Sequence, residues 1–126
     1  MHKSNRYRAL TPKEEWIMLH KGTEEPHSGE YNDCFLNGIY KCKRCLRPLY
    51  RSDSKLPSKL GWPSFNAALQ GAIKKTRSHN NDNTEIACAT CGGHLGHMCN
   101  SGDFSKNHPL HCINSTSLLF EYVKPN

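Results

Sequence analysis

Two pairs of cysteines, each separated by two residues, constrain this chain more than any other feature. The pairs are Cys42 with Cys45 and Cys88 with Cys91. This spacing lets both sulfurs of a pair point at one tetrahedral ion, and two pairs complete a shell of four thiolates. Because a complete shell leaves no position for water, we predict one structural Zn²⁺ per chain, holding two hairpins together, rather than a redox dithiol.

The composition favours such a metal staple. Only 36% of the 126 residues are hydrophobic, so the core is lean and metal binding would add folding free energy. No apolar stretch approaches the roughly 20 residues of a membrane span, and the first residues lack the apolar segment of a secretory signal. We expect a cytoplasmic protein that does not enter membranes, with a disordered lead over residues 1–10 and a single domain over residues 11–126.

The chain carries a net charge of +6, with a basic cluster at Lys41, Lys43, Arg44 and Arg47. A nucleic-acid binder would combine clustered basic residues with stacking aromatic residues, and aromatic residues make up only 9% of this chain. We therefore interpret these charges as solvated surface charge and expect no nucleic-acid partner.

A helix is predicted to begin at Thr11, because Thr11 and Glu14 form a capping box. It is expected to run through Trp16 and Leu19, which share one face. The turn-rich stretch 22–38 is predicted to be a long connection over the surface.

Short apolar or β-prone segments predict strands along the rest of the chain. The predicted strands begin or lie at residues 39–40, 49–50, 84–87, 94–99 and 110–120.

The last of these strands carries Cys112 and, two residues on, Asn114. Successive side chains of a strand point to opposite faces, so the thiol and the amide are expected to share a face. His94 and His97 lie on the preceding strand, three residues apart. Both can face Cys112 only if Gly96 allows a bulge or twist.

Several motifs accompany the two cysteine pairs. They are Gly-Thr-Glu at 22–24, Gly-Ile-Tyr at 38–40, Ser-Asp at 52–53, Gly-Trp-Pro-Ser-Phe at 61–65, Cys-Gly-Gly-His-Leu-Gly-His at 91–97 and Cys-Ile-Asn-Ser at 112–115. Taken in this order over residues 11–120, they resemble the B-type methionine sulfoxide reductases, which act on the R epimer of methionine sulfoxide.

This resemblance implies a mainly β fold, in which two antiparallel sheets form an open, barrel-like body with a small N-terminal helix and the four-cysteine zinc site. It also implies the site residues. These are Cys112 as the nucleophile, His97 and His94 as active-site histidines, Asn114 as the amide that orients His97, and Trp62 with Phe65 as the wall that holds the substrate methyl group.

The implied reaction is the reduction of methionine-R-sulfoxide, free or in oxidised proteins and peptides, as a repair of oxidative damage. A Cys112 thiolate attacks the sulfoxide sulfur, and a protonated His97 donates to the departing oxygen. The products are methionine and a Cys112 sulfenic acid, which thioredoxin or a similar reductant regenerates. We expect a monomer.

The chain departs from the family pattern at two charged positions. Where members commonly have an Asp and an Arg, this chain has Ser101 and Leu110. Asp103, His108 and His111 are the residues that could supply replacement polarity.

The thiol that resolves the sulfenic acid is a further departure. The family's usual resolving positions hold Leu60 and Ser28 in this chain. Three routes stay open: attack by Cys99, which shares a face with His97; attack by Cys34 from the long connection; and direct reduction by an external thiol.

Two rival functions belong to other classes. One is a non-enzymatic zinc module of related architecture, such as a chaperone of nucleotide-free GTPases, and the other is a zinc-ribbon nucleic-acid binder. Both leave Trp62, His97 and Asn114 without a role.

Overall fold

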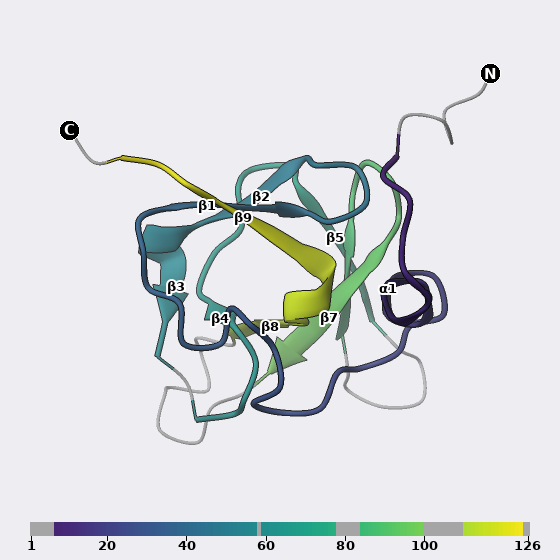
Figure 1. Ribbon diagram of the computed structural model, residues 1–126, viewed down its shortest axis with the longest axis horizontal. Helices are drawn as coiled ribbons and strands as arrows, with labels where there is room; N and C mark the ends of the chain where they lie inside the picture. The colour runs from purple at the N-terminus through teal and green to yellow at the C-terminus, as the bar shows by residue number, and fades with distance from the viewer. Residues whose placement is uncertain (1–6, 58, 78–83, 100–109, 125–126) are drawn as a thin grey trace.

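The computed structural model describes residues 7–57, 59–77, 84–99 and 110–124. Strands dominate this part of the chain (Figure 1). In chain order the elements are α1 (Pro12–Met18), β1 (Gly38–Cys42), β2 (Pro48–Arg51), the 3₁₀ turn η2 (Ser52–Ser54), β3 (Lys55–Leu56), β4 (Ser64–Phe65), β5 (Ile73–Arg77), β6 (Thr84–Cys88), β7 (His94–Cys99), β8 (Leu110–Ile113), the 3₁₀ turn η3 (Ser115–Ser117) and β9 (Leu118–Tyr122).

The strands form two sheets, and every described pairing between neighbours is antiparallel. One sheet has three strands in the order β2-β1-β9, and the other has six in the order β3-β4-β8-β7-β6-β5. Neither sheet closes on itself within the described residues. The predicted fold class is confirmed: the protein is mainly β, with two open antiparallel sheets and one small helix (Figure 1).

The helix α1 begins as predicted. The Thr11 hydroxyl accepts from the Glu14 backbone N–H at 3.2 Å, and the Glu14 carboxylate accepts from the Thr11 N–H at 3.0 Å. Its buried face is formed by Ile17 and Met18, however, whereas Trp16 is 52% exposed. The predicted packing face was therefore wrong by about one residue. No helix in the described ranges is both long and apolar enough to span a membrane.

The segment before α1 is attached to the rest of the protein from residue 7 onward. The Arg8 N–H donates to the Arg44 carbonyl at 2.7 Å, and the Arg44 guanidinium lies 4.6 Å from the centre of the Tyr7 ring. Leu10 packs against the core. The expectation of a disordered lead is therefore wrong for residues 7–10, while residues 1–6 lie outside the described residues.

Aromatic rings join the two sheets. Tyr40 of β1, Tyr50 of β2 and Phe65 of β4 are fully buried. The Tyr50 and Phe65 rings stack with their centres 4.2 Å apart, and Tyr40 meets Phe65 edge-on at 5.2 Å. Rings in such offset or edge-to-face arrangements add about 0.5–1.5 kcal/mol per pair beyond the burial of their surface. The core therefore lies between the three-stranded sheet and the β4 end of the longer sheet.

The connection between α1 and β1 is more than a surface loop. Glu24 is only 3% exposed, and Tyr31 packs in the core, with its hydroxyl accepting from the Phe120 N–H at 3.1 Å. Most residues of this connection are exposed, as predicted, but Glu24 and Tyr31 are buried and contact η3 and β9, so the segment is not only a surface loop.

Candidate metal centre and active site

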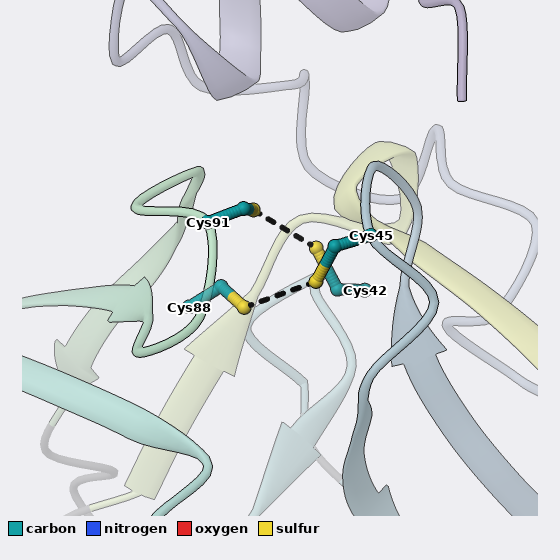
Figure 2. A group of neighbouring side chains, drawn as sticks. All are labelled: Cys42, Cys45, Cys88 and Cys91. Atoms are coloured by element: carbon teal, nitrogen blue, oxygen red, sulfur yellow. Dashed lines mark hydrogen bonds between the residues drawn. The ribbon is translucent and has the colours of Figure 1, made fainter. Parts of the chain in front are cut away.

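Four cysteine side chains converge from two hairpins (Figure 2). Cys42 ends β1 and Cys45 lies in the turn toward β2, while Cys88 ends β6 and Cys91 lies in the turn toward β7. Cys42 Sγ is 3.6 Å from Cys91 Sγ, and Cys45 Sγ is 3.6 Å from Cys88 Sγ. All four sulfurs lie within 4.8 Å of one another. The cluster therefore links the three-stranded sheet to the six-stranded sheet.

These distances fit a tetrahedral metal ion. Four sulfurs about 2.3 Å from a central ion lie about 3.8 Å from one another, so only a small contraction of the longest spacing is needed. Hydrogen bonds from the Cys42 and Cys91 thiols lower the pKa of Cys88, whereas the same contacts raise the pKa of Cys42 and burial raises that of Cys45, so the thiols share their protons and Cys88 is the one favoured as a thiolate. The four cysteines can hold a metal ion, as the spacing predicts.

Basic side chains of the first hairpin contact the second. Arg44 Nη1 donates to the Cys91 carbonyl at 3.1 Å, and Arg47 Nη1 donates to Thr90 Oγ1 at 2.7 Å. Lys43 pairs with Glu14 at 3.5 Å. The basic cluster thus has structural partners around the metal site, which weakens the case for nucleic-acid binding.

Cys112 lies in the middle of the longer sheet. In the strand register it is directly opposite His97 of β7 on one side and Ser64 of β4 on the other. Directly opposite side chains share a face, with Cβ atoms about 4.5–5.5 Å apart. The Ser64 hydroxyl lies 3.8 Å from Cys112 Sγ, and Cys112 is 3% exposed. The Cys112 thiol and the His97 ring are therefore neighbours on one face of the sheet.

A bulge brings His94 to the face of His97. Glu85 is opposite His97, and Ala87 is opposite His94, with a register shift after Ile86. Two residue steps along β6 thus match three along β7, so β7 carries one extra residue. Because Glu85 and Ala87 share a face, the two histidines share it too. The sequence predicted that His94 and His97 could both face Cys112 only if a bulge interrupted their strand, and the structure contains that bulge.

A carboxylate holds His94 on this face. His94 Nδ1 donates to Glu85 Oε2 at 2.8 Å, and Lys21 Nζ lies 3.2 Å from Glu85 Oε1. Burial raises the pKa of the Glu85 carboxyl, but the hydrogen bonds from His94 and Lys21 outweigh burial and leave the pKa below its usual value. Burial, and then the nearby His94, lower the pKa of His97. The His97 ring is thus favoured in its neutral form, which can accept a proton from a thiol.

Cys112 is joined to Cys99 by a disulfide, with their Cα atoms 6.0 Å apart. Cys99 is opposite Leu110 in the register, so the two cysteines are diagonal neighbours on one face. Cys34 is a free thiol that packs, partly buried, against the core.

Asn114 and Trp62 meet at a residue that the sequence did not single out, Glu24. Asn114 Oδ1 accepts from the Glu24 N–H at 2.9 Å, and its Nδ2 donates to the Leu95 carbonyl at 3.1 Å. The indole N–H of Trp62 donates to the Glu24 carbonyl at 3.1 Å. Both ends of the Asn114 amide therefore bind backbone groups, of Glu24 and Leu95.

The SelR domain family matches residues 10–122, which is most of the chain. The chain belongs to the SelR domain family. This SelR domain is 45% identical over 117 residues to peptide methionine sulfoxide reductase B2, chloroplastic, of Arabidopsis thaliana, covering 92% of the chain and 58% of that relative. It is 44% identical over 115 residues to peptide methionine sulfoxide reductase B9 of the same plant, covering 90% and 80%. With MsrB of Burkholderia ambifaria it shares 41% identity over 117 residues, covering 90% and 82%.

These relatives confirm the recognition of B-type methionine sulfoxide reductases, and with it the expected enzyme class. Among solved structures, the Mis18 "Yippee-like" domain superposes with a TM-score of 0.56, covering 71% of this SelR domain and 99% of that chain. Their identity is 13%, so this likeness concerns the fold alone.

Phe65 lies elsewhere than its predicted role requires. Ser64 faces Cys112, so the next residue, Phe65, points to the opposite face, where it is opposite His111 in the register. Its ring is fully buried against Tyr50. Phe65 is therefore a core residue of this SelR domain, and its expected place in the substrate wall is wrong.

Leu110 stands where family members commonly have an Arg. Leu110 is 1% exposed and lies opposite Cys99. His111 points to the opposite face from Cys112 and is hydrogen bonded through Nδ1 to the Tyr50 hydroxyl at 2.9 Å, so it does not supply polarity at the thiol. Ser101, Asp103 and His108 lie outside the described residues.

Sequence reasoning missed three polar groups around the site: Glu24, Glu85 and Ser64. Two signals could have indicated them. Glu24 and Ser64 belong to the motifs at 22–24 and 61–65. Glu85 lies on β6 directly opposite His97 of β7, so its side chain shares a face with that histidine.

Proposed function

We propose that this chain reduces the R epimer of methionine sulfoxide, free or in oxidised proteins and peptides, through a sulfenic acid on Cys112. The observation that carries the proposal is the position of Cys112, directly opposite His97 and disulfide bonded to Cys99. This arrangement provides a nucleophile, a proton carrier and a second thiol on one face of the sheet.

The first step consumes one thiol and transfers one oxygen. The neutral His97 ring accepts the proton of the Cys112 thiol, and burial of His97, which lowers its pKa, favours that neutral starting state. The thiolate attacks the sulfoxide sulfur while the imidazolium returns the proton to the oxygen. The sulfoxide is reduced by two electrons to methionine, and Cys112 is oxidised by two electrons to a sulfenic acid.

The second step closes a disulfide. The Cys99 thiolate attacks the Cys112 sulfur, the S–O bond breaks, and the hydroxide leaves with a proton as water. A Cα separation of 6.0 Å lies within the range that a disulfide requires. An external dithiol, thioredoxin or a similar protein, then reduces the disulfide and is itself oxidised. Cys34 and direct reduction of the sulfenic acid are the alternatives to this route.

The substrate methyl group is proposed to lie against Trp62. Its indole is fixed at one edge by the hydrogen bond to the Glu24 carbonyl and remains partly exposed. An apolar ring held in one orientation can distinguish the two epimers, because only one of them places its oxygen toward His97 when its methyl group contacts the ring.

The metal ion is proposed to be Zn²⁺, bound by Cys42, Cys45, Cys88 and Cys91. Four thiolates favour zinc, and a complete shell of protein ligands leaves no position for substrate. The ion would stabilise the fold by joining the two sheets.

A single-turnover assay tests the proposed function. The reduced protein is mixed with an excess of either epimer in the absence of external thiol, and methionine and the new disulfide are quantified by mass spectrometry. We expect about one equivalent of methionine from the R epimer, none from the S epimer, and a Cys99–Cys112 bridge. Cys112→Ser should abolish methionine formation, whereas Cys99→Ser should retain it and leave Cys112 as a sulfenic acid. Turnover by Cys112→Ser, or equal turnover of both epimers, would contradict the proposal.

A further inference from the structure

Glu24 is hydrogen bonded through its carboxylate and through its backbone to segments on both sides of the candidate active site. Its side chain is almost fully buried, in the connection between α1 and β1. One carboxylate oxygen accepts from the Ser115 N–H at 2.9 Å, and the other accepts from the Thr116 N–H at 2.9 Å and the Thr116 hydroxyl at 2.8 Å. All three donors belong to η3, the turn that follows the Cys112 strand.

The backbone of the same residue contacts two predicted site residues. As described above, the Glu24 N–H binds the Asn114 amide oxygen, and the Glu24 carbonyl binds the Trp62 indole N–H. A second hydrogen bond, from the His27 N–H to the Gly61 carbonyl at 2.7 Å, holds the same connection to the residue before Trp62. Glu24 thus links the segment that carries Trp62 to the segment that follows Cys112.

A carboxylate suits this place better than the isosteric amide. The first backbone N–H groups of a helical turn have no partner within the turn, and an ionised carboxylate offers two oxygens that only accept. A glutamine would turn its NH₂ group toward at least one N–H or O–H donor, leaving a buried donor without an acceptor. Glutamine at this position should therefore release one end of the contact while keeping its volume.

We propose that Glu24 is a positioning residue for sulfoxide reduction: its carboxylate holds the connection on η3, so that its backbone fixes the Trp62 indole relative to Cys112. The proposal rests on the proposed function, in which Trp62 contacts the substrate. Glu24 itself touches neither the substrate nor the reacting atoms.

The test uses Glu24→Gln in a Trp16→Phe background, which leaves Trp62 as the only tryptophan. Three quantities are measured well below the melting temperature: the acrylamide quenching of Trp62 fluorescence, and the kcat and KM for the R epimer. We expect stronger quenching and a fall of about tenfold or more in kcat/KM, mainly through a higher KM, because a displaced indole weakens substrate contact.

Glu25→Gln is the matched control. It makes the same change of charge one residue along the chain, at an exposed side chain. The control should keep wild-type quenching and kinetics. An equal effect in Glu25→Gln would overturn the proposal, because the loss of charge rather than the η3 contact would then be responsible.

Thr116→Val weakens the same contact by changing the partner of Glu24, since it removes only the hydroxyl donor. It should shift quenching and KM in the same direction by a smaller factor. If Glu24→Gln does not fold, wild-type values in Thr116→Val overturn the proposal. If Glu24→Gln folds, wild-type quenching or wild-type KM in that variant overturns it. A wild-type protein that does not reduce the R epimer would refute the proposed function instead, and the quenching comparison would still decide whether Glu24 positions Trp62.

Discussion

Gly96→Ala tests the close approach of β7 to the Cys112 strand. A methyl group on Gly96 would overlap the Cys112 carbonyl oxygen and lie 2.9 Å from Ile113 Cα and 3.0 Å from the Cys112 carbonyl carbon. Comfortable contacts between carbon atoms begin at about 3.5 Å. Because all three contacts are backbone atoms of β8, no rotation of a side chain relieves them, and the strands must separate by at least about half an ångström.

The expected cost combines two effects. Overpacking alone destabilises by about 1–3 kcal/mol, and each weakened hydrogen bond of the ladder adds up to about 1 kcal/mol. We expect Gly96→Ala to lower the free energy of unfolding by about 3 kcal/mol or more, a large part of the roughly 5–15 kcal/mol of a typical domain. The melting temperature should fall by about 10 °C.

Urea unfolding of metal-loaded wild type, Gly96→Ala and Gly71→Ala measures this cost. Gly71 is the matched control, because its φ of +73° strains any side chain while the nearest atom to an added methyl, Arg47 Nη2, is 3.7 Å away. Its substitution should cost only about 1–2 kcal/mol. If Gly96→Ala cost no more than Gly71→Ala and kept wild-type turnover, the inferred approach of β7 to β8 at Cys112 would be refuted.

Three further predictions concern the metal centre, the proton carrier and the opposite face. Cys45→Ser should release the bound ion in elemental analysis and destabilise the protein by about 3 kcal/mol or more, since it removes one of four thiolates. His97→Gln should slow single-turnover reduction by about 100-fold and flatten its dependence on pH, while Cys112 still reacts with an alkylating agent. Burial, with a smaller contribution from Lys75, lowers the pKa of His111 from 6.5 to about 4. Between pH 6.5 and about 4 the unfolded chain therefore binds more protons than the folded protein, so the stability present above pH 6.5 should be lost as the pH falls toward 4. The urea midpoint of His111→Gln should fall less over the same pH range than that of the wild type.

The features that the sequence predicted well depend on local spacing. The Cys-x-x-Cys pairs converge because each pair lies in one tight turn, and the capping box of Thr11 and Glu14 closes within four residues. The shared face of Cys112 and Asn114 was predicted from strand alternation; the strand ends at Ile113, and Asn114 is the extended residue that precedes η3. Strand alternation applies only as far as the backbone stays extended, so the sequence alone could not show where this pattern stops.

The features that could not be predicted depend on pairing between distant strands. The common face of His94 and His97 requires a mismatch with β6, which alternation along β7 alone cannot show. Phe65 was placed beside the substrate because it follows Trp62 in a motif, but its two-residue strand turns it to the core. The role of Glu24 depends on contacts with residues about 90 positions away, which no local pattern contains.

The strand order also has a consequence for synthesis of the protein. β8 lies between β4 and β7, which are not neighbours without it, and β9 forms one edge of the other sheet. Both strands emerge from the ribosome after every other described strand. A nascent chain can therefore form the hairpins of β1 with β2 and of β5, β6 and β7, but it cannot complete either sheet. Cys112 thus meets His97 and Cys99 only when the last strands insert, so a partly synthesised chain does not contain the assembled thiol pair.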